Sequence, residues 1–156
     1  MPDPIHSLQV ALIEPEIPQN TGTIGRSCLA LGAVLHLVHP LGFQLSAEKL
    51  RRSGLDYWRH VDLMLHDSLA DFLDSAAASR PMWFFSTRAT HSIYDARMEP
   101  DSVLVFGPES RGLPRSLLQD HPDRLLQIPM ESTHVRSLNL SNAVSVALYE
   151  AWRQQL

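Results

Sequence analysis

The sequence predicts an α/β domain with a mostly parallel sheet, because short apolar runs alternate along the chain with helical patterns. Several of these runs are apolar throughout, as in strands that helices cover on both faces. Four of the five runs are followed closely by proline or glycine, which indicates loops at their carboxyl ends. Parallel α/β folds place their binding sites at that edge of the sheet, so we expect function in these loops.

Five segments are expected to form the strands: Leu8–Ile13, Val34–Val38, Met82–Ser86, Val103–Phe106 and Leu125–Ile128. The first helix is expected over Thr21–Leu31, with Asn20 or Thr21 as its N-cap and Gly32 as its stop.

A second helix is expected over Ser68–Ala76, where Ser68 and Asp71 have capping-box spacing. The last helix is expected from about Ser141 to Gln154, with one apolar face. Its other face is too polar for a core and needs solvent or a partner to cover it; it carries Asn142, Ser145, Tyr149 and Arg153.

The chain has 156 residues and a mass of 17.5 kDa, which fits one domain over residues 1–156. Its one cysteine, Cys28, excludes an internal disulfide. No apolar run approaches the roughly 20 residues that cross a bilayer, and the first residues lack the pattern of a signal peptide. We therefore expect a cytoplasmic protein that does not enter a membrane.

The net charge of −4 argues against nonspecific coating of nucleic acid but leaves room for a local phosphate site. One lysine stands against twelve arginines. The densest basic run is Lys49, Arg51 and Arg52, followed by Arg59. This run is either a solvated helix face or a contact for phosphate groups.

Several common sites are excluded by spacing. Gly22 and Gly25 do not fit the dinucleotide motif G-x-G-x-x-G, and the chain has no P-loop and no G-x-S-x-G serine motif. The eight histidines show no spacing typical of a metal site, so we expect no metal.

Three segments have compositions that suggest a site. Ile17–Arg26 joins a strand end to a helix start, which is either a phosphate site or a capped helix with a surface arginine. Phe106–Pro114 is a rigid Gly- and Pro-rich loop whose Glu109 and Arg111 either recognise a ligand or form an ion pair. Ser137–Ala143 holds more Ser and Asn than one N-cap requires.

Together these segments resemble motifs 1, 2 and 3 of the SpoU branch of the SPOUT RNA ribose methyltransferases. The matching patterns are N-x-G-x-I-x-R from Asn20, F-G-P-E-x-R-G-L from Phe106, and I-P-M followed by S-L-N-L-S-N-A from Ile128. The resemblance extends through Lys49–Trp58 and the final Tyr149–Arg153, so it covers nearly the whole chain.

The resemblance implies a SPOUT fold with a C-terminal deep trefoil knot, S-adenosylmethionine as cofactor, and a homodimer that completes the site across its interface. It implies that the cofactor contacts Phe85, Ser86, Thr87, Gly107, Ile128, Met130, Ser137 and Leu138. It implies catalytic roles for Arg26, Asn20, Glu109, Ser141 and Asn142. RNA contacts are expected at Lys49, Arg51, Arg52, Arg59 and Arg111.

Within the family, the chain is most similar to small members that 2′-O-methylate the ribose of the wobble nucleotide, position 34, of leucine tRNAs. The expected substrate is then the anticodon stem-loop, with cytidine or carboxymethylaminomethyluridine at the target. The alternatives are another tRNA or rRNA site, an RNA-binding SPOUT module without catalysis, and a flavodoxin-like nucleotide binder.

Overall fold

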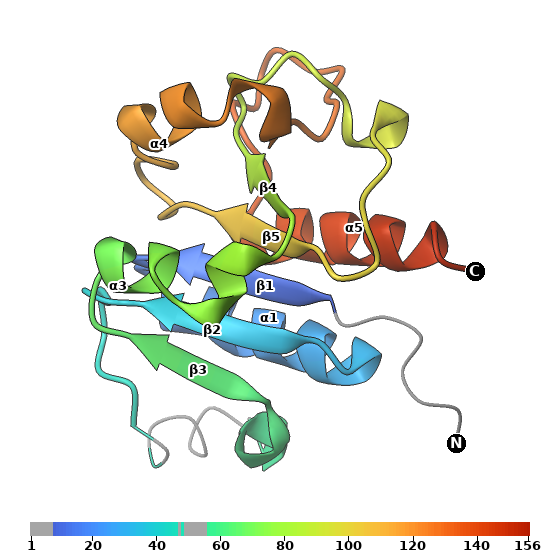
Figure 1. Ribbon diagram of the computed structural model, residues 1–156. Helices are drawn as coiled ribbons and strands as arrows, with labels where there is room; N and C mark the ends of the chain where they lie inside the picture. Colours follow the sequence, from blue (N-terminus) through green and yellow to red (C-terminus); the bar gives the residue numbers. More distant parts are fainter. Residues whose placement is uncertain (1–7, 47, 49–55) are drawn as a thin grey trace.

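The computed structural model describes residues 8–46, 48 and 56–156, and its centre is one parallel sheet with helices on both faces (Figure 1). The strands run in the order β3-β2-β1-β5-β4-β6. They are β1 (Gln9–Ile13), β2 (Val34–Val38), β3 (Leu63–His66), β4 (Met82–Phe85), β5 (Val103–Phe106) and β6 (Leu125–Leu126). The α-helices are α1 (Pro18–Leu31), α3 (Leu69–Leu73), α4 (Arg115–Asp120) and α5 (Leu140–Arg153). Short 3-10 helices are η1 (Asp56–His60), η2 (Ala76–Ser79), η3 (Ile93–Asp95) and η4 (Pro122–Arg124).

Alternate side chains of the strands enter two separate cores. On one face Val10 and Leu12 of β1 pack with Cys28 of α1 and with Val144 and Leu148 of α5. On the other face, another set packs together: Ala11 and Ile13 of β1, Phe72 of α3 and Leu117 of α4. The sheet is thus covered on both sides, which explains why its central strands are mostly apolar.

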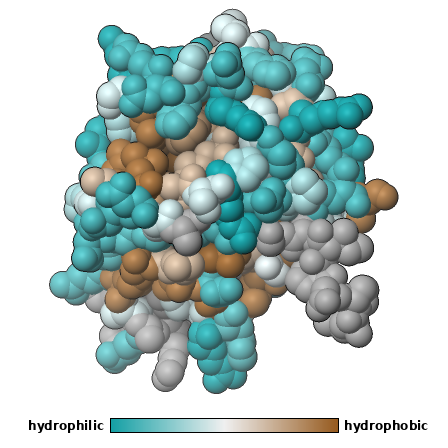
Figure 2. All heavy atoms as spheres, viewed as in Figure 1, coloured by the Kyte–Doolittle hydropathy of each residue, from teal (hydrophilic) through white to brown (hydrophobic). Residues whose placement is uncertain are grey.

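The sheet confirms the predicted α/β class, and β2 and β5 have the predicted bounds. The prediction for Leu125–Ile128 is too long, because the backbone of Gln127 leaves the sheet to bridge Ser92. Strand β3 was not predicted. It lies at the sheet edge and exposes both Met64 and Leu65, so it lacks the alternation that reveals a strand. Figure 2 shows hydrophobic residues at the surface where β3 lies in Figure 1.

The predicted start of the first helix is wrong. Helix α1 begins at Pro18, so Asn20 and Thr21 lie inside it, and its N-cap Ile17 offers no side-chain cap. Proline is favoured in the first turn because it has no N–H to satisfy. The helix ends at Gly32 as predicted, in the left-handed conformation with φ of 66°.

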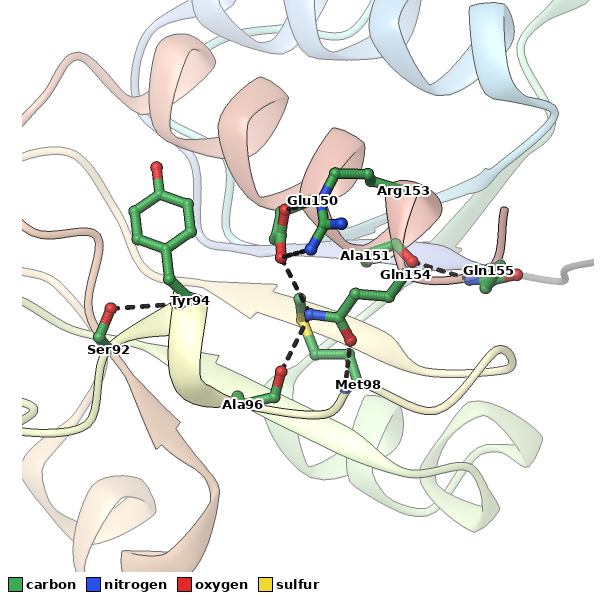
Figure 3. Close-up of polar contacts among 9 residues, drawn as sticks. All are labelled: Ser92, Tyr94, Ala96, Met98, Glu150, Ala151, Arg153, Gln154 and Gln155. Atoms are coloured by element: carbon green, nitrogen blue, oxygen red, sulfur yellow. Dashed lines mark hydrogen bonds and ion pairs between the residues drawn. The ribbon is translucent and has the colours of Figure 1, made fainter.

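The other predicted helices are found with altered bounds. Helix α3 is shorter than Ser68–Ala76, although Ser68 caps it by accepting from the Asp71 N–H. Helix α5 matches its prediction within one residue and is fixed at its end by Gln154 (Figure 3). The Gln154 amide donates to the Ala96 carbonyl and accepts from the Met98 N–H, both at 2.9 Å. Among the described residues, no helix is long and apolar enough to cross a membrane. The same residues contain no group of three or more His, Cys, Asp or Glu side chains that could hold a metal ion. The trefoil knot stays a prediction.

A buried histidine pair lies beneath α3, on the face of the sheet opposite α1. His36 Nδ1 lies 2.9 Å from His66 Nε2, and His36 Nε2 lies 2.6 Å from Gln9 Oε1. Burial lowers the pKa of His36 to about 4, and the positive charges of His66 and Arg80 act in the same direction. Burial also lowers the pKa of His66, against the opposing effect of Asp71.

We expect this pair to make the fold sensitive to mild acid. The unfolded chain takes up a proton at His36 near its ordinary pKa of about 6.5, whereas the folded chain does so near 4. The stabilisation is complete above pH 6.5 and is lost as the pH falls toward 4, by about 1–2 kcal/mol between pH 7 and 5. Urea unfolding at both pH values should show this loss in the wild type and a smaller one in His36→Gln. Equal losses in the two proteins would contradict the assignment.

Candidate active site

The loops at the carboxyl ends of four strands surround a cavity of about 960 Å³. They follow β1, β4, β5 and β6, which agrees with the expectation that function lies at this edge. Apolar side chains line one part of it, among them Phe85, Phe106 and Ile128. The rings of Phe85 and Phe106 stack with their centroids 4.5 Å apart, so this wall is firmly packed.

All eight residues predicted to contact the cofactor line this cavity: Phe85, Ser86, Thr87, Gly107, Ile128, Met130, Ser137 and Leu138. They come from the last residue of β4 and from the loops after β4, β5 and β6, so the fold gathers residues that are more than fifty positions apart. Gly107 lies where the chain doubles back, because a Cβ there would be 2.3 Å from the Gly112 carbonyl carbon.

The Glu109 carboxylate joins motif 2 to motif 1. Its Oε2 accepts from the Glu16 N–H at 2.7 Å, and its Oε1 accepts from the Ile17 N–H at 3.2 Å. Oε1 also accepts from the Asn20 side-chain amide at 3.4 Å. Glu109 thus holds, from a distant loop, the backbone just before α1 and the Asn20 side chain in its first turn. With both oxygens occupied in this way, it acts as a positioning residue.

The same two segments are also joined with donor and acceptor exchanged, because Glu16 accepts hydrogen bonds from the loop that carries Glu109. The Glu16 carboxylate accepts from the Ser110 N–H at 3.0 Å and from the Ser110 hydroxyl at 2.6 Å. These hydrogen bonds hold the pKa of Glu16 below its ordinary value. Arg111 lies in the same loop and pairs with Glu14 at 3.5 Å. The loop after β1 and the loop after β5 are therefore joined by three side chains: Glu109, Glu16 and Arg111.

Asn139 joins motif 3 to the same cluster. As the N-cap of α5 it accepts, through Oδ1, from the Ser141 N–H at 2.9 Å and from the Asn142 N–H at 3.4 Å. Its Nδ2 donates to Asn20 Oδ1 at 3.1 Å. The sequence prediction named Ser141 and Asn142, but neither lines the cavity: the Ser141 side chain is buried and Asn142 is exposed. Asn139 lines it and was missed, although an Asn before a helical pattern is a typical N-cap.

We expect Asn139→Ala to lower stability by about 1 kcal/mol through loss of the cap, or about 2–4 °C in Tm. A second variant, Asn139→Asp, tests the contact with Asn20 independently of the cap. It keeps an acceptor for the cap but removes the donor to Asn20. Asn139→Asp should retain the wild-type Tm and lose methyl transfer. Full activity in that variant would show that the contact with Asn20 does not position the site.

Arg26 does not line the cavity of its own chain. It lies six residues beyond Asn20, or about 9 Å further along α1, with an exposed side chain as the sequence predicted. Its guanidinium carbon is 5.5 Å from the centroid of the Tyr57 ring. Tyr57 in turn donates its hydroxyl to the Gly22 carbonyl at 3.0 Å, which fastens η1 to α1 beside Arg26.

The predicted RNA contacts fall in different places. Arg111 lines the cavity, Arg59 is exposed on η1, and Lys49, Arg51 and Arg52 lie outside the described residues. The structure adds three cavity-lining arginines that the sequence did not single out: Arg88, Arg115 and Arg136. They are isolated in the sequence, and only the fold places them around one cavity.

Comparison with known proteins identifies the family. The model of the SpoU rRNA methylase family matches residues 7–149. The chain belongs to this family. A tRNA (cytidine(34)-2′-O)-methyltransferase of Saccharophagus degradans is 46% identical over 146 residues, covering 93% of this chain and 94% of the relative.

Solved structures agree with this family assignment. One that concerns the 2-OH methylation of C/U34 on tRNA has a TM-score of 0.89 and 53% identity, covering 96% of this chain and 97% of the other. An AdoMet-bound rRNA methyltransferase from Sinorhizobium meliloti has a TM-score of 0.81 and 27% identity, covering 96% of this chain and 57% of the other. The predictions of a SPOUT methyltransferase fold, of an enzyme and of S-adenosylmethionine as its cofactor are confirmed.

Proposed function

We propose that this SpoU methylase, as a single SPOUT domain over residues 1–156, 2′-O-methylates the ribose of nucleotide 34 in leucine tRNAs, in the cytoplasm. The observation that carries the proposal is the near full-length match to relatives named for position 34. The target base is cytidine or carboxymethylaminomethyluridine. The anticodon stem-loop is the part of the tRNA that would meet the cavity.

The residues of the cavity fit S-adenosylmethionine. Its volume of about 960 Å³ lies at the upper end of the range for small-molecule sites, which leaves room for a nucleotide beside the cofactor. Phe85, Ile128 and Leu138 offer apolar surface, and Ser86, Thr87 and Ser137 offer polar groups. When bound there, the cofactor supplies the methyl group.

The chain's own task is to orient the ribose hydroxyl and manage its proton. Arg26 is a poor base because a guanidinium carries only hydrogen-bond donors and no acceptor. We assign it to the phosphate next to the target ribose, which its planar donors can grip at two points. The start of α1 is held by the hydrogen bonds among Asn20, Glu109 and Asn139, and Arg26 lies further along the same helix.

A homodimer is part of the proposal. Arg26 lies outside the cavity of its own chain, which supports a site that a second copy completes. The polar face of α5 still exposes Tyr149 and Arg153 beside α1, and the Ser145 hydroxyl lies 3.0 Å from that of Ser27. Such a surface is available for a second α1 and α5. Lys49, Arg51, Arg52 and Arg59 would grip the tRNA backbone.

Methyl-labelled S-adenosylmethionine and unmodified leucine tRNA transcripts test the proposal, with the product mapped by mass spectrometry. Label on the 2′-oxygen of nucleotide 34 is the expected result. Label on ribosomal RNA or at another tRNA site would move the activity elsewhere. Cofactor binding without transfer to any RNA would favour a binding module.

A further inference from the structure

Three exposed arginines stand on the rim of the cavity and come from separate loops. Arg88 follows β4, Arg115 opens α4, and Arg136 lies in the segment before α5. In the described part of the chain their side chains form no hydrogen bond or ion pair. Arg111 differs from them, because it pairs with Glu14.

Two carboxylates, Glu14 and Glu109, line the cavity together with four arginines. Glu14 pairs with Arg111 at 3.5 Å. Glu109 is held by the backbone N–H groups of Glu16 and Ile17, at 2.7 and 3.2 Å. The lining therefore has a net formal charge of +2, in a protein whose net charge is −4. A rim of one sign attracts the opposite charge to the cavity that it surrounds.

We propose that Arg88, Arg115 and Arg136 bind backbone phosphates of the substrate RNA next to the nucleotide whose ribose enters the cavity. This inference rests on the proposed function. Guanidinium groups bind phosphate through paired hydrogen bonds, and each neutralised phosphate releases counterions. A carboxylate of the cofactor is the other anion that could reach this rim, and the two sources differ in what they predict.

The test measures the affinity for an unmodified leucine tRNA transcript at several salt concentrations, for Arg88→Gln, Arg115→Gln, Arg136→Gln and the triple variant. Each substitution should reduce the slope of log affinity against log salt by about 0.7–0.9, and the triple variant by about 2–3. Affinity for S-adenosylmethionine, measured by calorimetry, should stay within about twofold of the wild type.

Arg97→Gln is the matched control. Arg97 is exposed beside the C-terminal end of α5, whereas the rim lies at its N-terminal end, about 20 Å away along that helix. An equal loss of slope in Arg97→Gln, or an unchanged slope in the triple variant, would overturn the proposal. So would weaker cofactor binding with an unchanged slope, which would assign the rim to the carboxylate.

The rim and the proposed function can fail separately. A wild type that binds tRNA through the rim but labels a nucleotide other than 34 would retain the rim and remove the proposed target. Label at nucleotide 34 together with an unchanged salt slope in the rim variants would retain the proposed target and remove the role of the rim.

Discussion

Gly107→Ala is expected to abolish methyl transfer and to raise the Kd for S-adenosylmethionine by at least about tenfold. A Cβ at this position would lie 2.3 Å from the Gly112 carbonyl carbon and from the Leu113 nitrogen. These are backbone atoms, so no side-chain rotation relieves the clash. The loop that carries Glu109 must shift, and its contacts with Glu16 and Asn20 are then lost. Calorimetric titration measures the binding, and we expect Tm to fall by about 4–8 °C for an overpacking cost of about 2 kcal/mol.

Gly32→Ala is the matched control. Gly32 has φ of 66°, but a Cβ there would meet no atom within 4 Å. The substitution strains the end of α1 by about 1 kcal/mol and leaves the cavity untouched. It should lower Tm while keeping wild-type cofactor affinity. Equal affinity in Gly107→Ala would mean that the loop can relax, and the assignment of Gly107 to the cofactor site would be withdrawn.

The difference between these glycines illustrates what the sequence could predict. The stop at Gly32 is a local signal, since a left-handed glycine ends a helix whatever lies around it. The strands β2 and β5 were likewise predicted to the residue, because strands covered on both faces are apolar at nearly every position, with His36 as the exception in β2. The same reasoning failed for β3, which is exposed at the sheet edge and has no such pattern.

In the site, too, some features could be predicted from the sequence and others could not. The eight predicted cofactor residues all line the cavity, and five of them lie in motifs 2 and 3, which the family resemblance could align. The hydrogen bonds that hold the residues just before α1 were not predicted, because their acceptor is Glu109, more than ninety residues away along the chain. The placement of Arg88, Arg115 and Arg136 around one cavity was not predicted either, because each is an isolated arginine in the sequence.

Arg26→Ala is expected to lower single-turnover methyl transfer by about 100-fold, the size of effect that a lost positioning contact produces. The side chain is exposed, so folding and cofactor affinity should be unchanged. Arg26→Lys keeps the charge but loses the planar pair of donors, and should also be slow. Near wild-type rates in Arg26→Lys would contradict a role in gripping the phosphate at two points.

If the chain forms the proposed homodimer, a mixed dimer of Arg26→Ala and Gly107→Ala chains decides which copy uses the arginine. Each variant alone is expected to be inactive. If Arg26 serves the partner's cavity, a mixed dimer has one complete site, with the intact cavity of one chain and the intact arginine of the other. An equal mixture refolded together should then recover about a quarter of the wild-type activity, because about half the dimers are mixed and each has one working site of two. If Arg26 serves its own cavity, every site in the mixture is defective and no activity returns. The position of Arg26 outside its own cavity favours the first result.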